Sequence, residues 1–129
     1  IVVKAAAVSD YTPVDVSREK ISKSPENKML ELTRTVDILL ELGKRKTTQF
    51  LAGFAAESRD LEESAARKLR EKSLDLIVAN DITSGDAGFA SDNNRVIILD
   101  REGRRIELPL SSKREIASRI WDRIEDLIG

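Results

Sequence analysis

The stretch Leu74-Asp75-Leu76-Ile77-Val78-Ala79, followed by Asn80-Asp81, decides the fold. Its aliphatic residues run almost without interruption, which is typical of a strand covered on both faces. The polar pair after the run marks the end of the strand. We therefore predict a buried strand over residues 74–79.

Helices and strands alternate along the chain before this strand. Residues 29–32 and 48–56 are predicted strands, and residues 36–46 are a predicted helix with Gly43 near its end. This alternation is typical of a mostly parallel α/β sheet with right-handed crossovers.

A second helix is predicted to end near Lys72, with Ser58 or Asp60 as its N-cap. One face of this helix is apolar, at the four-residue spacing of a surface helix packed on a core. The stripe consists of Leu61, Ala65 and Leu69.

The last third of the chain predicts a hairpin and a helix. Residues 96–99 and 105–108 flank the turn Arg101-Glu102-Gly103-Arg104, which adds an antiparallel edge to the sheet. Ser112-Lys113-Arg114-Glu115 is a capping box that opens the final helix. The apolar face of that helix is predicted to comprise Ile116, Ile120, Trp121, Ile124 and Leu127.

The beginning of the chain combines an apolar run with a long polar segment. Residues 1–8 predict a buried strand, so we expect a piece of a larger domain whose N-terminal strands are missing. The alternative is an edge strand that begins a complete domain. Residues 9–28 contain Pro13 and Pro25 and predict a long loop or flap, a kind of segment that is often functional.

Composition excludes several kinds of chemistry. The chain has 129 residues, enough for one domain, with 22 Lys and Arg against 23 Asp and Glu and a net charge of -1. Such a balance argues against a strongly basic nucleic-acid binder. The absence of His and Cys excludes thiolate nucleophiles, disulfides, imidazole bases and the usual zinc sites. No apolar run approaches the roughly 18 residues needed to cross a bilayer, and no signal peptide is visible.

Open α/β sheets bind ligands beyond the carboxyl ends of their strands. The residues at these positions are Ser9-Asp10, Ala56-Glu57 and Asn80-Asp81, although the last pair could also simply stop a strand. No Gly-rich phosphate loop is present, so lysines would have to hold any phosphate. Lys68 and Lys72 lie one turn apart without an acid four residues earlier. Such an unpaired basic pair suits an anion, although the pattern alone favours a snorkelled pair.

Several blocks of the sequence carry a resemblance to a known family. They are Ala5-Ala6-Ala7-Val8-Ser9-Asp10-Tyr11, Thr35-Val36-Asp37-Ile38-Leu39, Gly53-Phe54-Ala55-Ala56-Glu57, Asp75-Leu76-Ile77-Val78-Ala79-Asn80-Asp81, and Gly88-Phe89 with Asp92-Asn93. In this order, over nearly the whole chain, they resemble bacterial phosphopantothenate–cysteine ligase. In bacteria this ligase is commonly the C-terminal half of a bifunctional coenzyme A biosynthesis protein, whose N-terminal half is an FMN-dependent decarboxylase.

The resemblance implies a CTP-dependent reaction in the cytoplasm. The carboxylate of 4'-phosphopantothenate attacks CTP, with Mg²⁺, to give an acyl-cytidylate, and L-cysteine then displaces CMP. Residues 1–129 correspond to the C-terminal part of one Rossmann-like ligase domain, in which residues 10–28 form a flap that helps build a homodimer. The family's Asn motif for the second step lies upstream of this region. The chain alone is therefore expected to be inactive, and FMN to belong only to the decarboxylase half.

The resemblance also implies a set of nucleotide-binding residues and assigns no protein ligand to a metal. The set is Ala6, Asp10, Lys20, Thr35, Val36, Asp37, Ile38, Phe54, Lys68 and Lys72. Lys20 is the expected catalytic residue, since its family counterpart faces the triphosphate. Val36 replaces a common Pro, and Ser22 stands where some members have a second flap lysine, with Lys23 the nearest substitute.

Other interpretations remain beside this one. From the residues alone, residues 35–37 could be only a helix cap, and Phe54 could belong to the core. The chain could also be a non-catalytic nucleotide-binding or dimerisation module of the same fold. An unrelated enzyme such as a dinucleotide oxidoreductase is disfavoured, because no G-x-G-x-x-G turn is present.

Overall fold

The computed structural model describes residues 1–23, 25, 27–57, 59–81 and 92–129, and only the backbone of Asp81. Ser58 and the Gly88-Phe89 block therefore lie outside the described residues. The described elements, in chain order, are β1 (Val2–Lys4), β2 (Tyr11–Pro13), β3 (Leu32–Arg34), α1 (Ile38–Arg45), β4 (Leu51–Glu57), α2 (Leu61–Glu71), β5 (Leu76–Asp81), β6 (Asn93–Asp100), β7 (Arg105–Ser112) and α3 (Lys113–Ile128).

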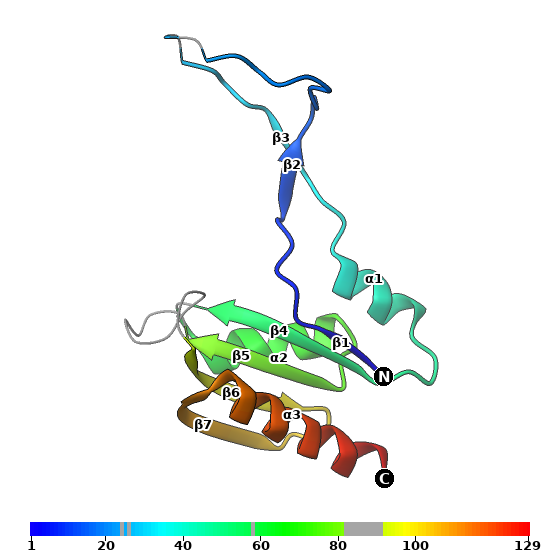
Figure 1. Cartoon of the computed structure of the whole chain (residues 1–129). Coiled ribbons are helices and arrows are strands. Elements are labelled where there is room, and N and C mark those ends of the chain that lie inside the picture. Colours follow the sequence, from blue (N-terminus) through cyan, green and yellow to red (C-terminus); the bar gives the residue numbers. More distant parts are fainter. Residues whose placement is uncertain (24, 26, 58, 82–91) are drawn as a thin grey trace.

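The main sheet has five strands in the order β1-β4-β5-β6-β7 (Figure 1). Strands β1, β4 and β5 run parallel, whereas β6 is antiparallel to β5 and β7 is antiparallel to β6. This arrangement confirms the predicted mostly parallel sheet with an antiparallel hairpin at its edge. Leu76 and Val78 of the central strand β5 are fully buried, as the quoted stretch predicts.

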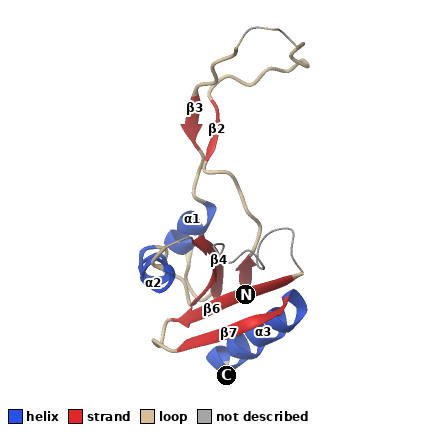
Figure 2. Cartoon of the chain, turned by 90° about the vertical axis from the view of Figure 1, so that its left-hand side faces the viewer, coloured by secondary structure: helices blue, strands red, loops and turns tan. Residues whose placement is uncertain are grey.

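Helices cover both faces of the sheet, and two apolar clusters result. On one face α3 packs on β4, β5 and β6 through Ile116, Ile120 and Ile124. On the other face α1 and α2 pack on the same strands, with Leu39 and Ala65 at the centre of the contact (Figure 2). The predicted stripe of α2 is confirmed, because Ala65 is completely buried and Leu61 and Leu69 pack against the cluster.

Strand β1 differs from the prediction of a buried strand. It pairs only with β4 in the described sheet, and Val2 and Val3 are 36% and 42% exposed. The regular strand also ends at Lys4, well before Val8. An apolar run therefore correctly predicted a strand here, but burial depends on neighbours that the run itself does not specify.

The predicted long loop forms a projecting arm. Strands β2 and β3 pair antiparallel in a separate two-stranded sheet, and the described residues between them lie far from the main sheet (Figure 1). The strand predicted at residues 29–32 lies instead at Leu32–Arg34. We refer to residues 11–34 as the arm.

The three helix starts follow the expected caps only in part. Asp37 and Ser112 accept hydrogen bonds from the backbone N–H groups of Leu40 and Glu115, respectively. Asp60 stands at the N-cap of α2 but has a left-handed backbone with φ of 48° and makes no side-chain cap bond. The position of this cap was therefore predictable, but its bonding was not.

The predicted face of α3 is wrong at one residue. Trp121 is 48% exposed, whereas Arg123 is buried on the side where the helix meets the sheet. Arg123 is tolerated there because its guanidinium donates to the buried carboxylate of Asp100 at 2.7 Å and to Glu102 at 3.0 Å. The buried face of α3 thus includes an ion pair and leaves out the aromatic residue that was expected on it.

Asp75 joins three parts of the sheet at its amino-terminal end. Its carboxylate accepts the N–H of Leu51 at 2.8 Å and pairs with Lys46 and Arg101, each at 2.6 Å. Burial alone would raise the pKa of Asp75, but the hydrogen bonds from Lys46, Leu51 and Arg101 outweigh it and lower the pKa. The folded state therefore favours the ionised carboxylate of Asp75.

We predict that Asp75→Asn lowers the free energy of unfolding by about 3 kcal/mol at pH 7, because Lys46 and Arg101 lose their buried counter-charge. Urea unfolding measures the effect. Glu71→Gln, which breaks only the exposed pair with Arg67, should change stability by less than about 0.5 kcal/mol.

The lowered pKa of Asp75 also predicts that the stability difference between wild type and Asp75→Asn depends on pH. A carboxyl group with a lowered folded-state pKa stabilises the fold above its unfolded-state pKa and loses that effect as pH falls through the folded value. The stability gap between wild type and Asp75→Asn should therefore shrink below about pH 4. A gap that stays constant down to pH 2 would contradict the role of the charge.

Candidate functional site

A cavity of about 610 Å³ opens at the carboxyl ends of β1, β4 and β5. Its walls come from residues 4–10, 35–39 and 54–56, from the end of α2, and from residues of β5, β6 and the first half of α3. This is the edge at which open α/β sheets bind ligands, and the volume lies within the usual range of about 300–1,000 Å³ for small-molecule sites.

Nine of the ten residues predicted to bind nucleotide line this cavity. They are Ala6, Asp10, Thr35, Val36, Asp37, Ile38, Phe54, Lys68 and Lys72. They come from four separate stretches of the sequence, which the sheet and the two helices α1 and α2 bring together.

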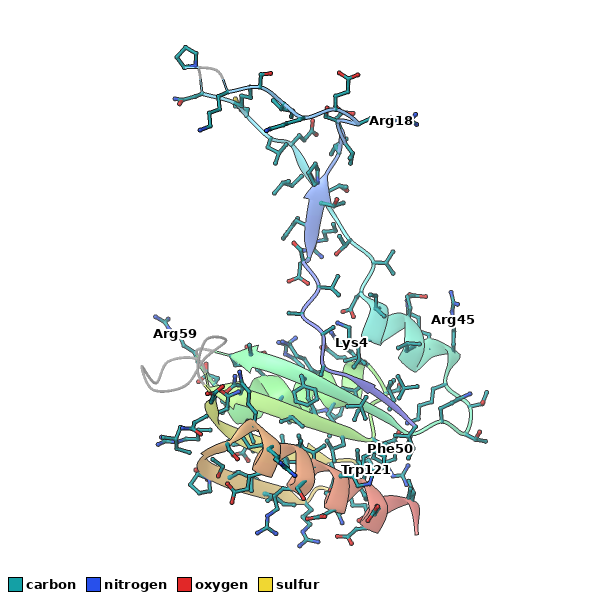
Figure 3. All side chains as sticks on the ribbon, viewed as in Figure 1. Lys4, Arg18, Arg45, Phe50, Arg59 and Trp121 are labelled. Carbon is teal, nitrogen blue, oxygen red and sulfur yellow. The ribbon has the colours of Figure 1, made fainter. Side chains whose placement is uncertain are left out.

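Lys20, the tenth residue, does not line the cavity. It lies on the exposed connection of the arm, beyond β2 and close in sequence to Arg18, which Figure 3 shows at the far part of the arm. The arm projects away from the main sheet of its own chain (Figures 1 and 2).

The base of the arm is clamped where it meets the cavity. The hydroxyl of Thr35 donates to the carbonyl of Ser9 at 2.6 Å, and the N–H of Thr35 donates to the carbonyl of Asp10 at 2.9 Å. These bonds hold the segment after β1 against the segment before α1. Two cavity walls that are distant in sequence are thereby fixed to each other.

Asp37 is both a helix cap and part of the cavity wall. Its carboxylate accepts the N–H of Leu40 at 3.0 Å and pairs with Lys72 at 2.8 Å. Burial would raise the pKa of Asp37, but Lys72 and the Leu40 N–H more than offset this and lower it. Asp37 therefore caps α1 and lines the cavity at the same time.

Gly43 allows this pairing by letting α1 approach the end of α2. A Cβ atom at this position would lie 2.0 Å from the carbonyl oxygen of Lys72, which is much closer than any real contact. The lack of a side chain at Gly43 thus sets the spacing between Asp37 and Lys72.

Both lysines of the predicted basic pair have acidic partners. Lys72 pairs with Asp37, and Lys68 pairs with Glu57 at 2.5 Å. The expectation of an unpaired basic pair is therefore wrong. The partners come from the start of α1 and the end of β4, so a search for acids one helical turn away could not find them.

Phe54 lies at the mouth of the cavity. Its ring belongs to neither apolar cluster and is 38% exposed, although Ala52, two residues earlier on the same face of β4, is fully buried. The core interpretation of Phe54 is therefore not supported. An exposed aromatic face beside two lysines suits a flat, anionic ligand.

The cavity also contains polar residues that the sequence did not single out, and Asn80, whose role it left open. Asn80 follows the apolar residues that β5 places on the α3 face, and Asn94 precedes those of β6. Lys4 and Lys113 also line the cavity. The side-chain oxygens of Asn80 and Asn94 are buried, and neither has a hydrogen-bond partner in the described part of the chain. A break in the apolar alternation at both positions was the signal that could have identified them.

A metal site built wholly from protein ligands is not seen in the described residues. Residues 1–81 and 92–129, apart from the gaps given above, contain no group of three or more acidic side chains that could hold an ion. In the same part of the chain, no helix has the length and apolarity that a membrane span requires.

The architecture and the position of the cavity define an open α/β domain with a ligand site at the carboxyl edge of its sheet. The family described as the DNA/pantothenate metabolism flavoprotein C-terminal domain matches residues 1–128. The chain belongs to this family.

Individual relatives agree with this assignment. The coenzyme A biosynthesis bifunctional protein CoaBC of Bacillus subtilis is 49% identical over 127 residues, which are 98% of this chain and 31% of that protein. A cysteine/cysteine sulfinic acid decarboxylase from an unknown prokaryotic organism is 39% identical over 99% of this chain and 36% of its own length.

A solved structure shows the same fold. The crystal structure of the C-terminal domain of a CoaBC protein superposes with a TM-score of 0.75 and 42% identity, covering 98% of this chain and 53% of that chain. The resemblance to the C-terminal part of the bifunctional protein is confirmed. The chain spans about a third of the length of the curated relatives named above.

The two roles of Asp37 predict different outcomes for two substitutions. Asp37→Ala should lower the free energy of unfolding by about 1 kcal/mol, because the Leu40 N–H loses its cap. Asp37→Ser keeps a capping oxygen and should be nearly neutral for stability, while it frees Lys72. Urea unfolding of both variants tests this, and equal losses would contradict the capping role.

Proposed function

We propose that this chain is the nucleotide-binding part of a CTP-dependent phosphopantothenate–cysteine ligase in coenzyme A biosynthesis, a cytoplasmic pathway. In the first step the carboxylate of 4'-phosphopantothenate attacks the α-phosphorus of CTP, and pyrophosphate leaves. In the second step the amine of L-cysteine attacks the acyl carbon, the amide forms and CMP leaves. The names of the CoaBC relatives support the pathway.

The observation that carries the proposal is the convergence of nine predicted nucleotide-binding residues on one cavity. Phe54 offers a partly exposed residue for a base, and Lys68 and Lys72 line the same cavity. Residues 35–38 contribute the start of α1, whose N-terminal dipole favours a negative group.

The charge around the cavity also suits a nucleotide bound with a metal. Four lysines (Lys4, Lys68, Lys72 and Lys113) and two aspartates (Asp10 and Asp37) line it. Mg²⁺ on a nucleotide usually takes only one or two protein carboxylates besides phosphate oxygens. Asp10 fits that role, because Asp37 already binds Lys72 and the start of α1. When bound, Mg²⁺ would offset charge between the two anionic substrates.

The first functional test is the choice of nucleotide. In the full-length protein that carries this chain, CTP should bind about ten- to a hundredfold more tightly than ATP, because a site shaped for one base leaves polar groups unpaired with the other. Calorimetry with both nucleotides in Mg²⁺ measures this. Equal dissociation constants would contradict the CTP assignment.

The arm needs a partner to take part in this reaction. Lys20 is remote from the cavity of its own chain, and the arm exposes large apolar side chains, among them Val16 (75%), Met29 (100%) and Leu30 (65%). A homodimer in which each arm covers the other copy would bury these side chains. It would also bring Lys20 to the triphosphate of the second copy, where it would act as the catalytic residue.

A mixing experiment tests this arrangement. Lys20→Gln should mainly lower kcat, and Lys68→Gln should mainly raise the KM for CTP, each by about ten- to a hundredfold. At low CTP, re-equilibrated equal mixtures of the two variants should recover about a quarter of wild-type activity, because only one site in four has both lysines.

The control is Lys44→Gln, which alters an exposed lysine paired with Glu41 outside the cavity and should leave kcat and KM unchanged. Each variant alone, taken through the same exchange, gives the baseline. No recovery in a mixture that has formed mixed dimers would contradict action across the dimer.

A further inference from the structure

Glu57 is the last residue of β4 and has no place in the function proposed above. Its side chain is only 18% exposed, and it pairs with the ammonium group of Lys68. Burial would raise the pKa of Glu57, but Lys68 and the nearby Ser64, on the same helix, outweigh this effect and lower the pKa. A partly buried carboxylate that an ion pair holds against one helix is a fixed group, not a free surface charge.

Glu57 and Lys68 differ in their position relative to the cavity. Lys68 lines the cavity, whereas Glu57 does not. Along β4, Phe54 shares its face with Ala52 on the α3 side, and Glu57 shares its face with Leu51 and Ala55 on the α2 side. Glu57 therefore contacts Lys68 on the α2 side of β4, which is opposite to the side that carries the ring of Phe54.

This geometry decides between two roles for the carboxylate. A lysine ammonium has three N–H donors, and the bond to Glu57 uses one of them. A carboxylate inside the cavity would compete with an anionic ligand for the other donors. A carboxylate outside the cavity instead holds the flexible lysine side chain in one orientation. Binding of a ligand then does not have to fix the conformation of that side chain.

We propose that Glu57 is a positioning residue that orients Lys68 toward a phosphate group in the cavity. The inference rests on the proposed nucleotide site and adds to it a residue that does not touch the ligand. The pair Asp37–Lys72 differs from it, because Asp37 lines the cavity itself.

Two substitutions at Glu57 distinguish positioning from simple repulsion. Glu57→Met removes the acceptor and should raise the dissociation constant for CTP about tenfold. Glu57→Gln keeps an oxygen that accepts from Lys68 and should recover most of the affinity. If Glu57 acted only as a negative charge near an anion, both variants would bind CTP more tightly, and the proposal would be overturned.

A double-mutant cycle shows whether the effect passes through Lys68. In a Lys68→Met background, Glu57→Met should change the CTP dissociation constant less than about twofold. A full tenfold loss in that background would assign Glu57 a general structural role and contradict the inference. Glu71→Met, at the exposed end of α2, is the matched control and should have no effect on binding.

The measurement is calorimetric titration of the full-length protein with CTP and, separately, with inorganic tripolyphosphate. Thermal unfolding of every variant verifies that the fold is intact. Wild type that binds tripolyphosphate but shows no preference for CTP contradicts the proposed nucleotide, and the Glu57 variants still test the inference. Wild type that binds neither probe overturns both, and unchanged affinity in Glu57→Met overturns the inference alone.

Discussion

The carboxylate of Asp75 is the interaction on which the order of the sheet depends. The backbone N–H of this residue donates to the carbonyl of Leu51 in β4, and its carbonyl accepts the N–H of Arg101 in the β6–β7 turn. Its side chain binds Leu51, Lys46 and Arg101 as well. One buried charge thus fixes the amino-terminal ends of the parallel strands β4 and β5 at one level, beside the β6–β7 turn. Because strands rise by a constant amount per residue, their carboxyl ends are fixed too. The cavity lies at those ends.

The opposite end of the sheet handles charge differently. At the amino-terminal end, Asp75 is almost completely enclosed, and its partners serve the fold. At the cavity, Lys68 and Lys72 each pair with one carboxylate and remain partly exposed. A lysine that already has one carboxylate partner loses less side-chain freedom when an anion arrives. The paired lysines are therefore compatible with a binding site, although their local sequence suggested bare charges.

The sequence predicted the elements of the fold better than their surroundings. The apolar run of residues 74–79 and the stripe of α2 specify a buried strand and a packed helix, because both are local features of the sequence. The exposure of Trp121, the burial of Arg123 and the edge position of β1 depend on contacts that close only in three dimensions. The same holds for the site. Family resemblance identified nine cavity residues. It did not identify the pairing of Lys68 with Glu57, because these residues lie on different elements. It also missed Asn94, which lies beside a β-bulge between β6 and β7 that no short motif predicts.

The contact between Gly43 and Lys72 shows that the width of a cavity can be set by an atom that is missing. A methyl group at position 43 would collide with backbone, which cannot rotate aside as a side chain can. The first effect of a larger residue would be to move α1 away from α2, and with it the wall formed by residues 35–39. The core on the far side of the sheet, built around α3, would be untouched. This part of the chain could therefore lose the shape of its ligand site while most of its apolar core stays intact, so a stability assay alone would underestimate the importance of a single hydrogen atom.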